Sequence, residues 1–352
     1  MAHNRESPGK RLSRHLINAK FRAEQAATRI GMQATMVDFE YVYKGLCGLA
    51  RAHRANTMAG HLGAAVVAGY FFGEERHDLD ERVVSAVEKE LDRIIKGDEA
   101  LWFDAKKAGI TVPELFEPFP EEQPQEKLIS TIAEALSRNI EKTRQSGHNV
   151  IFAAIAIRAL HDHAEYATPS LVNGIRKLIE GFNGAVPGRG YYGKQRGWIV
   201  GNKVSLPRDD GFPPYKDEQA MAEIVIDELI RSASVRKQGF GGLFHIINHA
   251  TALTELSRLR YKDLARKGLA AHHHHVRLLR SLPGVEGKVG PLKKAKHDPR
   301  TADYWNVDEA SQWSARLTHR IKTLYGFFNL LRFIEQPKKR KKAEQSFLYL
   351  MA

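Results

Sequence analysis

The chain has 352 residues, of which 43% are hydrophobic and 27% are charged. This length and balance predict a globular protein with a deep core and exclude a largely disordered chain. The single cysteine, Cys47, excludes an internal disulfide bond and a cysteine-rich zinc or iron–sulfur site. Because Cys47 lies in the apolar run YVYKGLCGLA, we interpret it as a core residue.

The hydropathy pattern gives no sign of export or of membrane insertion. The first residues, MAHNRESPGKRLSRH, are polar and lack an apolar segment, so we expect no secretory signal. No uninterrupted apolar stretch approaches the roughly 18 residues that a membrane span requires. We therefore expect a cytoplasmic protein.

The formal net charge is +13, and much of the excess lies in three basic runs. These are RESPGKRLSRH near the start, KKAKH at 293–297 and QPKKRKK at 336–342. Such runs are usually solvated, and contact with nucleic acid or another polyanion is the second interpretation. We predict a basic N-terminal helix or arm over 1–34 and a basic C-terminal tail over 336–352.

Apolar residues spaced three or four apart predict helices along most of the chain. The predicted helices span 10–30, 35–54, 57–73, 79–97, 124–145, 148–165, 169–185, 217–234, 240–258, 261–282 and 307–335. Strand-type alternation is scarce. The main irregular region, 186–216, is rich in glycine, proline and aromatic residues, and a loop of this length in a compact domain is often functional. A second irregular region spans about 283–304.

A repeated pattern organises these helices. Segments that begin at Gly60, Gly147 and Gly239 each run through an apolar helix with small residues, turn, and continue in an amphipathic helix. The first helix of each unit suits a position packed on all sides, and the second suits an outer layer. We predict an all-α protein, an (α/α) toroid or barrel of about 11–12 helices that forms a single domain over 35–335.

This organisation resembles the α/α-toroid enzymes, among them the unsaturated-glucuronyl hydrolases, the lanthionine cyclases and the terpenoid cyclases. The resemblance covers about residues 35–335 and rests on architecture. One cysteine cannot supply the Cys-Cys-His zinc set of the lanthionine cyclases, and neither RDDG at 208–211 nor HDLDE at 77–81 is the aspartate motif of the terpenoid cyclases. No catalytic residue is carried over from these families.

In a toroid, the inner helices direct one common end towards a central cavity. His61 and His148 occupy matching positions, each directly after a glycine at the start of an inner helix. The third unit has glycines there and places His245 one turn later, and His319 begins another long apolar helix. We therefore expect four histidines to converge. The alternative is that each is a core or interhelical histidine.

His245 and His249 lie four residues apart and therefore share one helical face. Two imidazoles at this spacing can bind one divalent metal. The glutamate of an HEXXH motif is absent, because the intervening residues are Ile246, Ile247 and Asn248. A metal site, an acid/base pair and structural packing all remain open for this pair.

Two other motifs are rich in histidine. The run HHHH at 272–275 sweeps about 300° around a helix, so its rings cannot serve one site. We expect His275 to face inward and His272 to share part of that inward face. The run as a whole is interpreted mostly as a feature of an outer helix. ALHDHAE at 159–165 is similar to the metal-dependent phosphohydrolases with a His-Asp doublet, but the upstream histidine of that family would have to lie on a separate helix.

The long loop carries the sequence GRGYYGKQRGWIVGNK. Aromatic and cationic side chains among glycines suit a sugar ring, a nucleotide base or an anionic group. The residues concerned are Arg189, Tyr191, Tyr192, Lys194, Arg196 and Trp198. Neither a P-loop nor a dinucleotide-binding spacing is present. The loop is interpreted either as a lid that binds substrate or as a plain connecting or oligomer-contact loop; Asp209 and Asp210 are interpreted as turn residues, with acid catalysis as the alternative.

From these observations we predict an enzyme with a histidine-lined central pocket. It would be a hydrolase or lyase that acts on a small anionic or polyhydroxylated substrate, with histidines as general acid and base. The predicted catalytic set is His61, His148, His245, His249 and His319, and a divalent metal is an open alternative as cofactor. The second hypothesis is a basic helical scaffold that binds nucleic acid or a protein partner.

Overall fold

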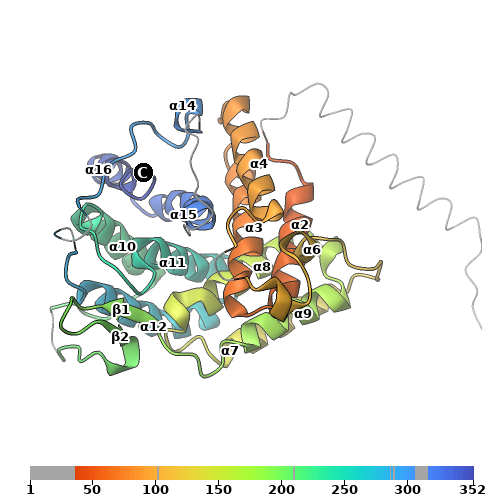
Figure 1. The fold of residues 1–352 in the computed structure, drawn as a ribbon, viewed down its shortest axis with the longest axis horizontal. Helices are drawn as coiled ribbons and strands as arrows, with labels where there is room; N and C mark the ends of the chain where they lie inside the picture. The colour runs from red at the N-terminus through yellow and green to blue at the C-terminus, as the bar shows by residue number, and fades with distance from the viewer. Residues whose placement is uncertain (1–35, 101–102, 209–210, 286, 288–289, 306–315) are drawn as a thin grey trace, which may run out of the picture.

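The computed structural model describes residues 36–100, 103–208, 211–285, 287, 290–305 and 316–352 (Figure 1). This part of the chain contains fourteen α-helices and one two-stranded sheet. The predicted all-α class is therefore confirmed. The predicted N-terminal helix and the pair Asp209 and Asp210 lie outside the described residues. None of the described helices is long and apolar enough to cross a membrane.

Four helices form the centre of the molecule (Figure 1): α3 (Gly60–Glu74), α8 (His148–Asp162), α11 (Gly242–Arg258) and α15 (Arg316–Leu331). Their contacts close a ring, because α3 packs on α8, α8 on α11, α11 on α15, and α15 on α3. Nearly every residue of α3 and α8 is buried. A helix that is apolar all round requires such a position, which accounts for the patterns in the sequence.

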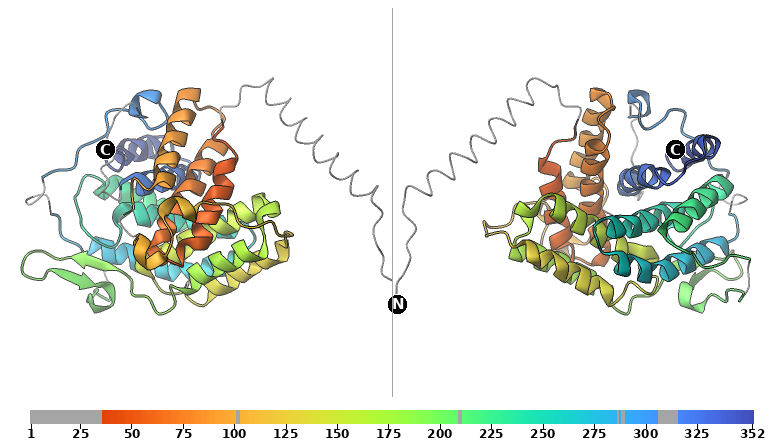
Figure 2. Two further views of the ribbon diagram at one scale, coloured as in Figure 1. Left: turned by 45° about the vertical axis from the view of Figure 1, so that its right-hand side comes forward. Right: turned by 180° about the vertical axis from the view of Figure 1, so that it is seen from behind.

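The longer outer helices cover this centre from several sides. They are α2 (Glu40–Ala52), α4 (Glu81–Lys96), α7 (Ile129–Ser137), α9 (Pro169–Glu180), α10 (Glu218–Ser232), α12 (Lys262–Arg280) and α16 (Pro337–Phe347). Both α2 and α4 pack on α3, α12 packs on α11, and α10 packs on α11 and α15. The views in Figure 2 show α2 to α4 on one side of the molecule and α10 to α12 on the other. Three further helices are single turns: α5 (Ala105–Ala108), α6 (Val112–Leu115) and α14 (Ala302–Trp305).

Two helix predictions differ from the structure. The helix predicted over 124–145 is limited to α7, and the following residues form turns. The predicted C-terminal tail instead contains α16, which begins at Pro337. This helix buries Ala343 and Phe347, and the Phe347 ring stacks on Phe327 of α15 with centroids 3.9 Å apart. The sequence pattern did not predict this helix, because only two residues form its buried face and five basic residues precede them.

The long irregular region contains the only sheet in the described chain. Strand β1 (Arg189–Tyr191) pairs antiparallel with β2 (Trp198–Val200) to form a hairpin. Gly190, the middle residue of β1, also forms an isolated antiparallel bridge with Gly239 in the loop that precedes α11. A β-carbon at Gly190 would lie 2.4 Å from the Phe240 ring, so glycine is required for this close approach. The hairpin is therefore fastened to the start of a central helix.

Candidate metal centre

Four imidazole rings, one from each central helix, meet inside the protein. The Nε2 atom of His148 lies 2.6 Å from Nε2 of His61 and 2.9 Å from Nε2 of His245. The Nε2 atom of His319 lies 3.3 Å from that of His245. We call these four residues the histidine centre. None is more than 8% exposed, so the rings meet away from solvent.

Each of these histidines lies in the first turn of its helix. His148 is the first residue of α8 and His61 the second of α3, and His245 and His319 are the fourth residues of α11 and α15. Side chains lean towards the N-terminus of a helix, so the rings gather where the four helices begin. The partial positive charges of four helix N-termini therefore surround the rings.

Backbone carbonyls fix the protonation pattern of two rings. The Nδ1 atom of His148 donates to the carbonyl of Gln145, and Nδ1 of His245 donates to the carbonyl of Gly241 at 2.7 Å. A carbonyl oxygen only accepts, so both Nδ1 atoms carry the hydrogen. A neutral imidazole has one N–H group. The Nε2 atoms of His148 and His245 therefore both present a lone pair.

These two bare Nε2 atoms face each other at 2.9 Å, a distance at which two lone pairs repel. A shared proton would relieve the repulsion by making one ring cationic. Burial opposes this, because it lowers the pKa of His148 to about 3 and the pKa of His245 well below its ordinary value. An N–H on Nε2 of His61 can also satisfy the lone pair of His148, since those two atoms lie 2.6 Å apart. A metal ion that accepts both lone pairs is a further solution. Metal-bound imidazoles commonly donate their remaining N–H to a backbone carbonyl, as both rings do here.

The separations within the centre suit a single ion. Two nitrogens bound to one tetrahedral ion at about 2.0–2.1 Å stand roughly 3.3 Å apart. Ligand atoms of His61, His245 and His319 all lie within 4.8 Å of one another. His148 is not one of that group of three, but its Nε2 atom lies 2.6 and 2.9 Å from the Nε2 atoms of His61 and His245. A small outward movement of the rings would accommodate an ion.

A buried lysine lies against the centre. Lys322 follows His319 by one turn of α15, and its Nζ atom lies 2.6 Å from Nδ1 of His61. Burial lowers the pKa of Lys322 to about 7, and the carboxylate of Glu99 acts in the opposite direction. Glu99 accepts hydrogen bonds from the N–H and hydroxyl groups of Thr318, and so also caps the start of α15. The sequence prediction missed Lys322 and Glu99; the one available signal was a lysine three residues after a histidine in an apolar helix.

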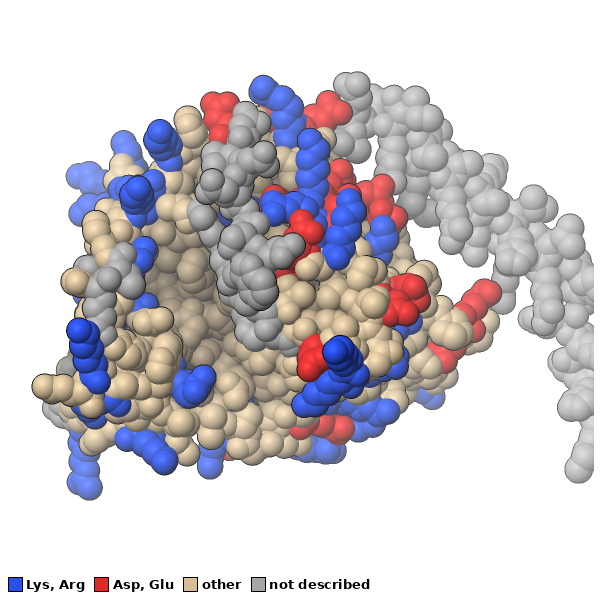
Figure 3. Space-filling model, in the orientation of Figure 1, with Lys and Arg blue, Asp and Glu red and all other residues tan. Residues whose placement is uncertain are grey.

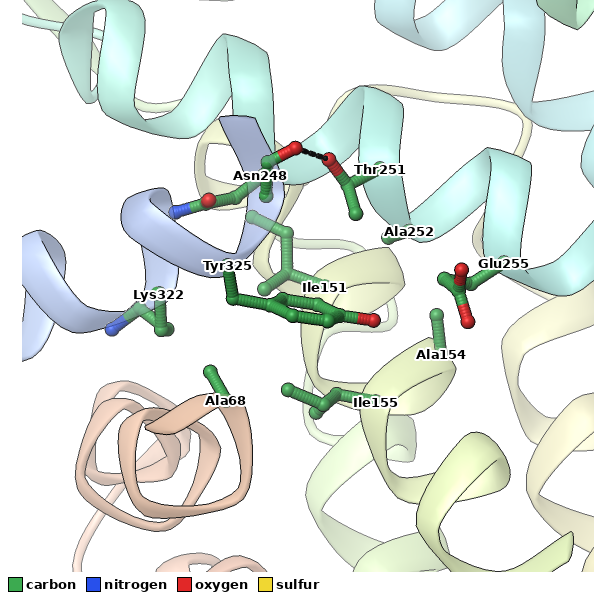
Figure 4. A pocket seen from close by; sticks show the side chains of 11 residues that line it. Ala68, Ile151, Ala154, Ile155, Asn248, Thr251, Ala252, Glu255, Lys322 and Tyr325 are labelled. Atoms are coloured by element: carbon green, nitrogen blue, oxygen red, sulfur yellow. Dashed lines mark hydrogen bonds between the residues drawn. The ribbon is translucent and has the colours of Figure 1, made fainter. Parts of the chain in front are cut away.

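A small cavity lies between the four central helices, next to the histidine centre (Figure 4). Its first residues, Ile151, Asn248 and Lys322, each lie three positions after a histidine of the centre. The remaining lining residues are Ala68, Ala154, Ile155, Thr251, Ala252, Glu255, Tyr325 and Gly326. Its volume of about 20 Å³ has room for about one water molecule. None of the histidines predicted to line a central pocket lines this cavity.

Two strained loops supply the carbonyls that orient the rings. Gln145 and Ser146 before α8, and Phe240 before α11, have φ angles of 42°, 61° and 48°. Residues with a side chain rarely adopt this left-handed region, and the strain of about 1–3 kcal/mol per residue persists only where the surroundings enforce it. The next residue in each loop is a glycine with positive φ, Gly147 or Gly241.

One segment of the long irregular region enforces both loops. The N–H of Gln145 donates to the carbonyl of Val186 at 2.7 Å, and the N–H of Ser146 donates to that of Pro187 at 2.9 Å. The N–H of Phe240 donates to the carbonyl of Arg189 at 2.8 Å. Residues 186–191 therefore hold the backbone on which His148 and His245 depend.

His249, predicted as the partner of His245, is oriented towards α12. Its Nδ1 atom lies 3.3 Å from Nδ1 of His275, and its ring centroid lies 5.0 Å from that of His272. Burial lowers the pKa of His249 well below its ordinary value. Its Nε2 atom is buried without a hydrogen-bond partner in the described chain. The i, i+4 spacing places both histidines on one face of α11, but they belong to different clusters.

The HHHH run contacts a different segment with each ring, as the sweep of helical positions predicts. His272 and His275 are fully buried, and His273 and His274 are partly buried. His272 contacts the carbonyl of Ile246, and His273 stacks on the ring of Phe212. His274 contacts the hydroxyl of Thr143, and His275 contacts the carbonyl of Phe240. The run therefore fastens α12 to its surroundings on several sides.

The HDH motif at 161–163 lies at the end of α8 opposite His148. The Nε2 atom of His161 lies 3.1 Å from the hydroxyl of Tyr261, and Asp162 pairs with Arg158 at 3.3 Å. The motif is therefore separated from the histidine centre by the length of a fifteen-residue helix.

The residues predicted to bind substrate lie on the β-hairpin and contact one another. Arg189 lies over the Trp198 ring, and Tyr191 packs beside the same ring with centroids 5.7 Å apart. Arg196 lies over Tyr192, whose hydroxyl is 2.6 Å from that of Ser281 at the end of α12. Lys194 is exposed. A substrate-binding role for these six residues stays a prediction.

Comparison of the chain with protein-family models, with curated proteins and with solved structures finds no match.

Proposed function

We propose that the protein is a metalloenzyme whose histidine centre binds one divalent transition-metal ion. The observation that carries the proposal is the pair of Nε2 lone pairs of His148 and His245 that face each other at 2.9 Å. Four imidazoles suit zinc, copper, iron or nickel rather than magnesium or calcium, which prefer oxygen ligands. We also propose that the hairpins α3–α4, α8–α9 and α11–α12 surround this centre as part of a small α/α toroid.

The geometry favours metal ligation over acid/base catalysis by the histidines themselves. Burial and the carbonyl hydrogen bonds keep His148 and His245 in one neutral tautomer. A general acid or base near neutral pH must instead change its protonation state readily. An ion at this position would polarise a bound water or a substrate oxygen, which is the role of metals in hydrolases and lyases.

The surroundings of the centre favour a small anionic substrate. All four ligands are neutral imidazoles, so an ion bound there keeps its full charge. Four helix N-termini and the side chain of Lys322 add positive potential. A further ligand on the ion is therefore best stabilised when it is an anion, such as hydroxide, a carboxylate or a phosphate. The cavity beside the centre holds only about 20 Å³, so a larger substrate would require the helices that line it to move apart.

Metal analysis tests the proposal. Protein purified and then loaded with Zn²⁺ or Co²⁺ is expected to hold about one ion per chain, and Co²⁺ should show the absorption of a nitrogen-ligated site. The variants His148→Ala and His245→Ala should lose the ion. The matched control is His161→Ala, at the other end of the same helix as His148, which should keep it. Circular dichroism of each variant verifies that the fold persists.

The result that overturns the metal site is a wild-type protein that binds neither ion, or a control that loses the ion as the two variants do. The enzymatic part has a separate test, in which Zn²⁺-loaded and chelator-treated protein are compared on phosphate esters, carboxylate esters and small hydroxy acids. Turnover is expected only with the ion. Tight metal binding without turnover on any of these substrates would contradict the enzymatic part and leave the metal site standing.

A further inference from the structure

Two basic runs that are distant in sequence lie side by side in the structure. The N–H of Ala295, in the run KKAKH, donates to the carbonyl of Leu348 just after α16 at 2.9 Å. The Nζ atom of Lys294 lies over the ring of Tyr349, 5.1 Å from its centroid. The run at 293–296 therefore lies against the C-terminal end of α16, the helix that carries the second run.

The helical period places the lysines of α16 on its outer surface. Lys338, Lys341 and Lys342 are exposed, whereas Ala343 and Phe347 face the core. Positions i, i+3 and i+4 form one stripe of a helix. The other two basic residues of the helix are engaged elsewhere, because Lys339 pairs with Asp227 at 2.8 Å and Arg340 donates to the carbonyl of Leu331.

These two adjoining segments carry six exposed lysines, which we group as the basic face: Lys293, Lys294, Lys296, Lys338, Lys341 and Lys342. No ion pair joins any of the six to a carboxylate within the described part of the chain. In Figure 3, Asp and Glu gather mainly on the side of α2 and α4, whereas Lys and Arg lie on both sides, so the side that carries α16 shows basic side chains with few acidic ones. Six unpaired like charges repel one another in the free protein and are stabilised by a polyanion.

We infer that the basic face is a binding surface for the phosphate backbone of nucleic acid. Lysine is a point charge without the bidentate geometry that reads bases, so the contact is independent of sequence. A lipid surface is the competing partner for a lysine cluster. The large hydrophobic side chains exposed in the described chain, Val186, Trp198 and Val235, lie outside the basic face, so it offers no side chain for membrane insertion.

Fluorescence anisotropy of the full chain with a labelled duplex of about 20 base pairs tests the inference. Affinity is expected to fall with salt, with a slope of log K against log salt of about −0.9 for each phosphate neutralised. The triple variants K338Q/K341Q/K342Q and K293Q/K294Q/K296Q should each weaken binding at least about tenfold at low salt and reduce the slope by about 2–3. The control K106Q/K107Q/K127Q removes three exposed lysines outside the basic face and should change affinity less than about twofold.

Three results would overturn the inference. The first is no binding of the duplex at low salt. The second is equal weakening by the control, which would assign binding to net charge. The third is tighter binding to phosphatidylserine vesicles than to the duplex, abolished by the same variants, which would assign the face to a membrane. Metal content, measured in parallel, keeps this test independent of the histidine centre.

Discussion

Arg158 of α8 is a buried charge surrounded by acids at the ends of the central helices. Its guanidinium is 2.5 Å from the carboxylate of Glu75, 3.6 Å from that of Glu255 and 3.7 Å from the centroid of the Phe71 ring. It also donates to the hydroxyl of Tyr325 at 2.6 Å. A buried pair of this kind contributes little net stability, but the loss of Arg158 leaves Glu75 and Glu255 ion-paired, within the described chain, only with the exposed Arg332 and Arg258.

The first prediction follows from this arrangement. Arg158→Met should lower the free energy of unfolding by roughly 3–5 kcal/mol, because Glu75 and Glu255 lose their buried partner. Urea denaturation measures the change. The control Arg332→Met removes a side chain that is 54% exposed and pairs with the same Glu75 at 2.7 Å, and it should cost at most about 1 kcal/mol. Equal losses in the two variants would contradict the prediction.

The second prediction concerns the pH dependence of stability. Burial lowers the pKa of His272 from 6.5 to about 3. The unfolded chain therefore binds a proton at this residue below pH 6.5, while the folded chain does not until about pH 3. Protonation of His272 therefore does not affect the free energy of unfolding above pH 6.5. Between pH 6.5 and pH 3 it lowers that free energy by about 1.4 kcal/mol for each unit by which the pH falls.

His272→Gln keeps a donor for the carbonyl of Ile246 and an acceptor for the hydroxyl of Tyr215. The variant should therefore show a shallower loss of unfolding free energy between pH 6 and pH 4, by about 1.4 kcal/mol per unit. Urea titrations at several pH values provide the measurement. The exposed His297 is the control, since His297→Gln should leave the slope unchanged. An unchanged slope for His272→Gln would refute the assignment.

The element that matters most for the histidine centre is the hairpin, although none of its side chains belongs to the centre. Segment 186–191 supports both strained loops through backbone hydrogen bonds. Composition alone predicted a lid or connecting loop here, because glycines and aromatics say nothing about which backbone groups they reach. The backbone contacts give this region a supporting role for His148 and His245, beside the substrate contact that the sequence predicts.

The third prediction tests that support. A side chain at Gly190 would collide with Phe240 and Leu282, so Gly190→Val should displace β1 from the loop before α11. Because the Gly241 carbonyl orients His245, affinity for Zn²⁺ should fall about 10–100-fold. Competition with a chelating dye measures this. The control K194A/R196A alters only exposed residues at the hairpin tip and should bind Zn²⁺ like the wild type; wild-type affinity in Gly190→Val would exclude the hairpin as a support.

At the scale of the element, sequence patterns predicted which segments are helices better than they predicted which side chains of different helices meet. The glycine-led repeat indicated His61 and His148 as a matched pair, and helix starts added His245 and His319. Lys322 was missed because its contact with His61 joins residues 261 positions apart. His249 was misassigned because periodicity gives the face of a helix but not the neighbour that covers it. The carbonyl groups of Gln145 and Gly241 could not be foreseen, since backbone strain has little signature in composition.

At the scale of the molecule, an ion in the histidine centre would tie four central helices together. Binding to the folded state alone stabilises it by about 4 kcal/mol when the free ion exceeds Kd about 1000-fold. The fourth prediction is therefore a rise in Tm of roughly 5 °C with saturating Zn²⁺. Calorimetry with and without Zn²⁺ provides the measurement, and Mg²⁺ is the control ion. The double variant H148A/H245A should show no rise; an equal rise there would place the ion elsewhere.

The separation of the four histidines along the chain has a consequence for biosynthesis. Successive partners in the centre are 87, 97 and 74 residues apart. The last ligand, His319, reaches its place only when α15 has been translated and docked. If an ion binds all four histidines, it can be fully enclosed only after α15 has docked, and its enclosure would be among the final events of maturation. Occupancy would then report that the whole chain has been made and folded.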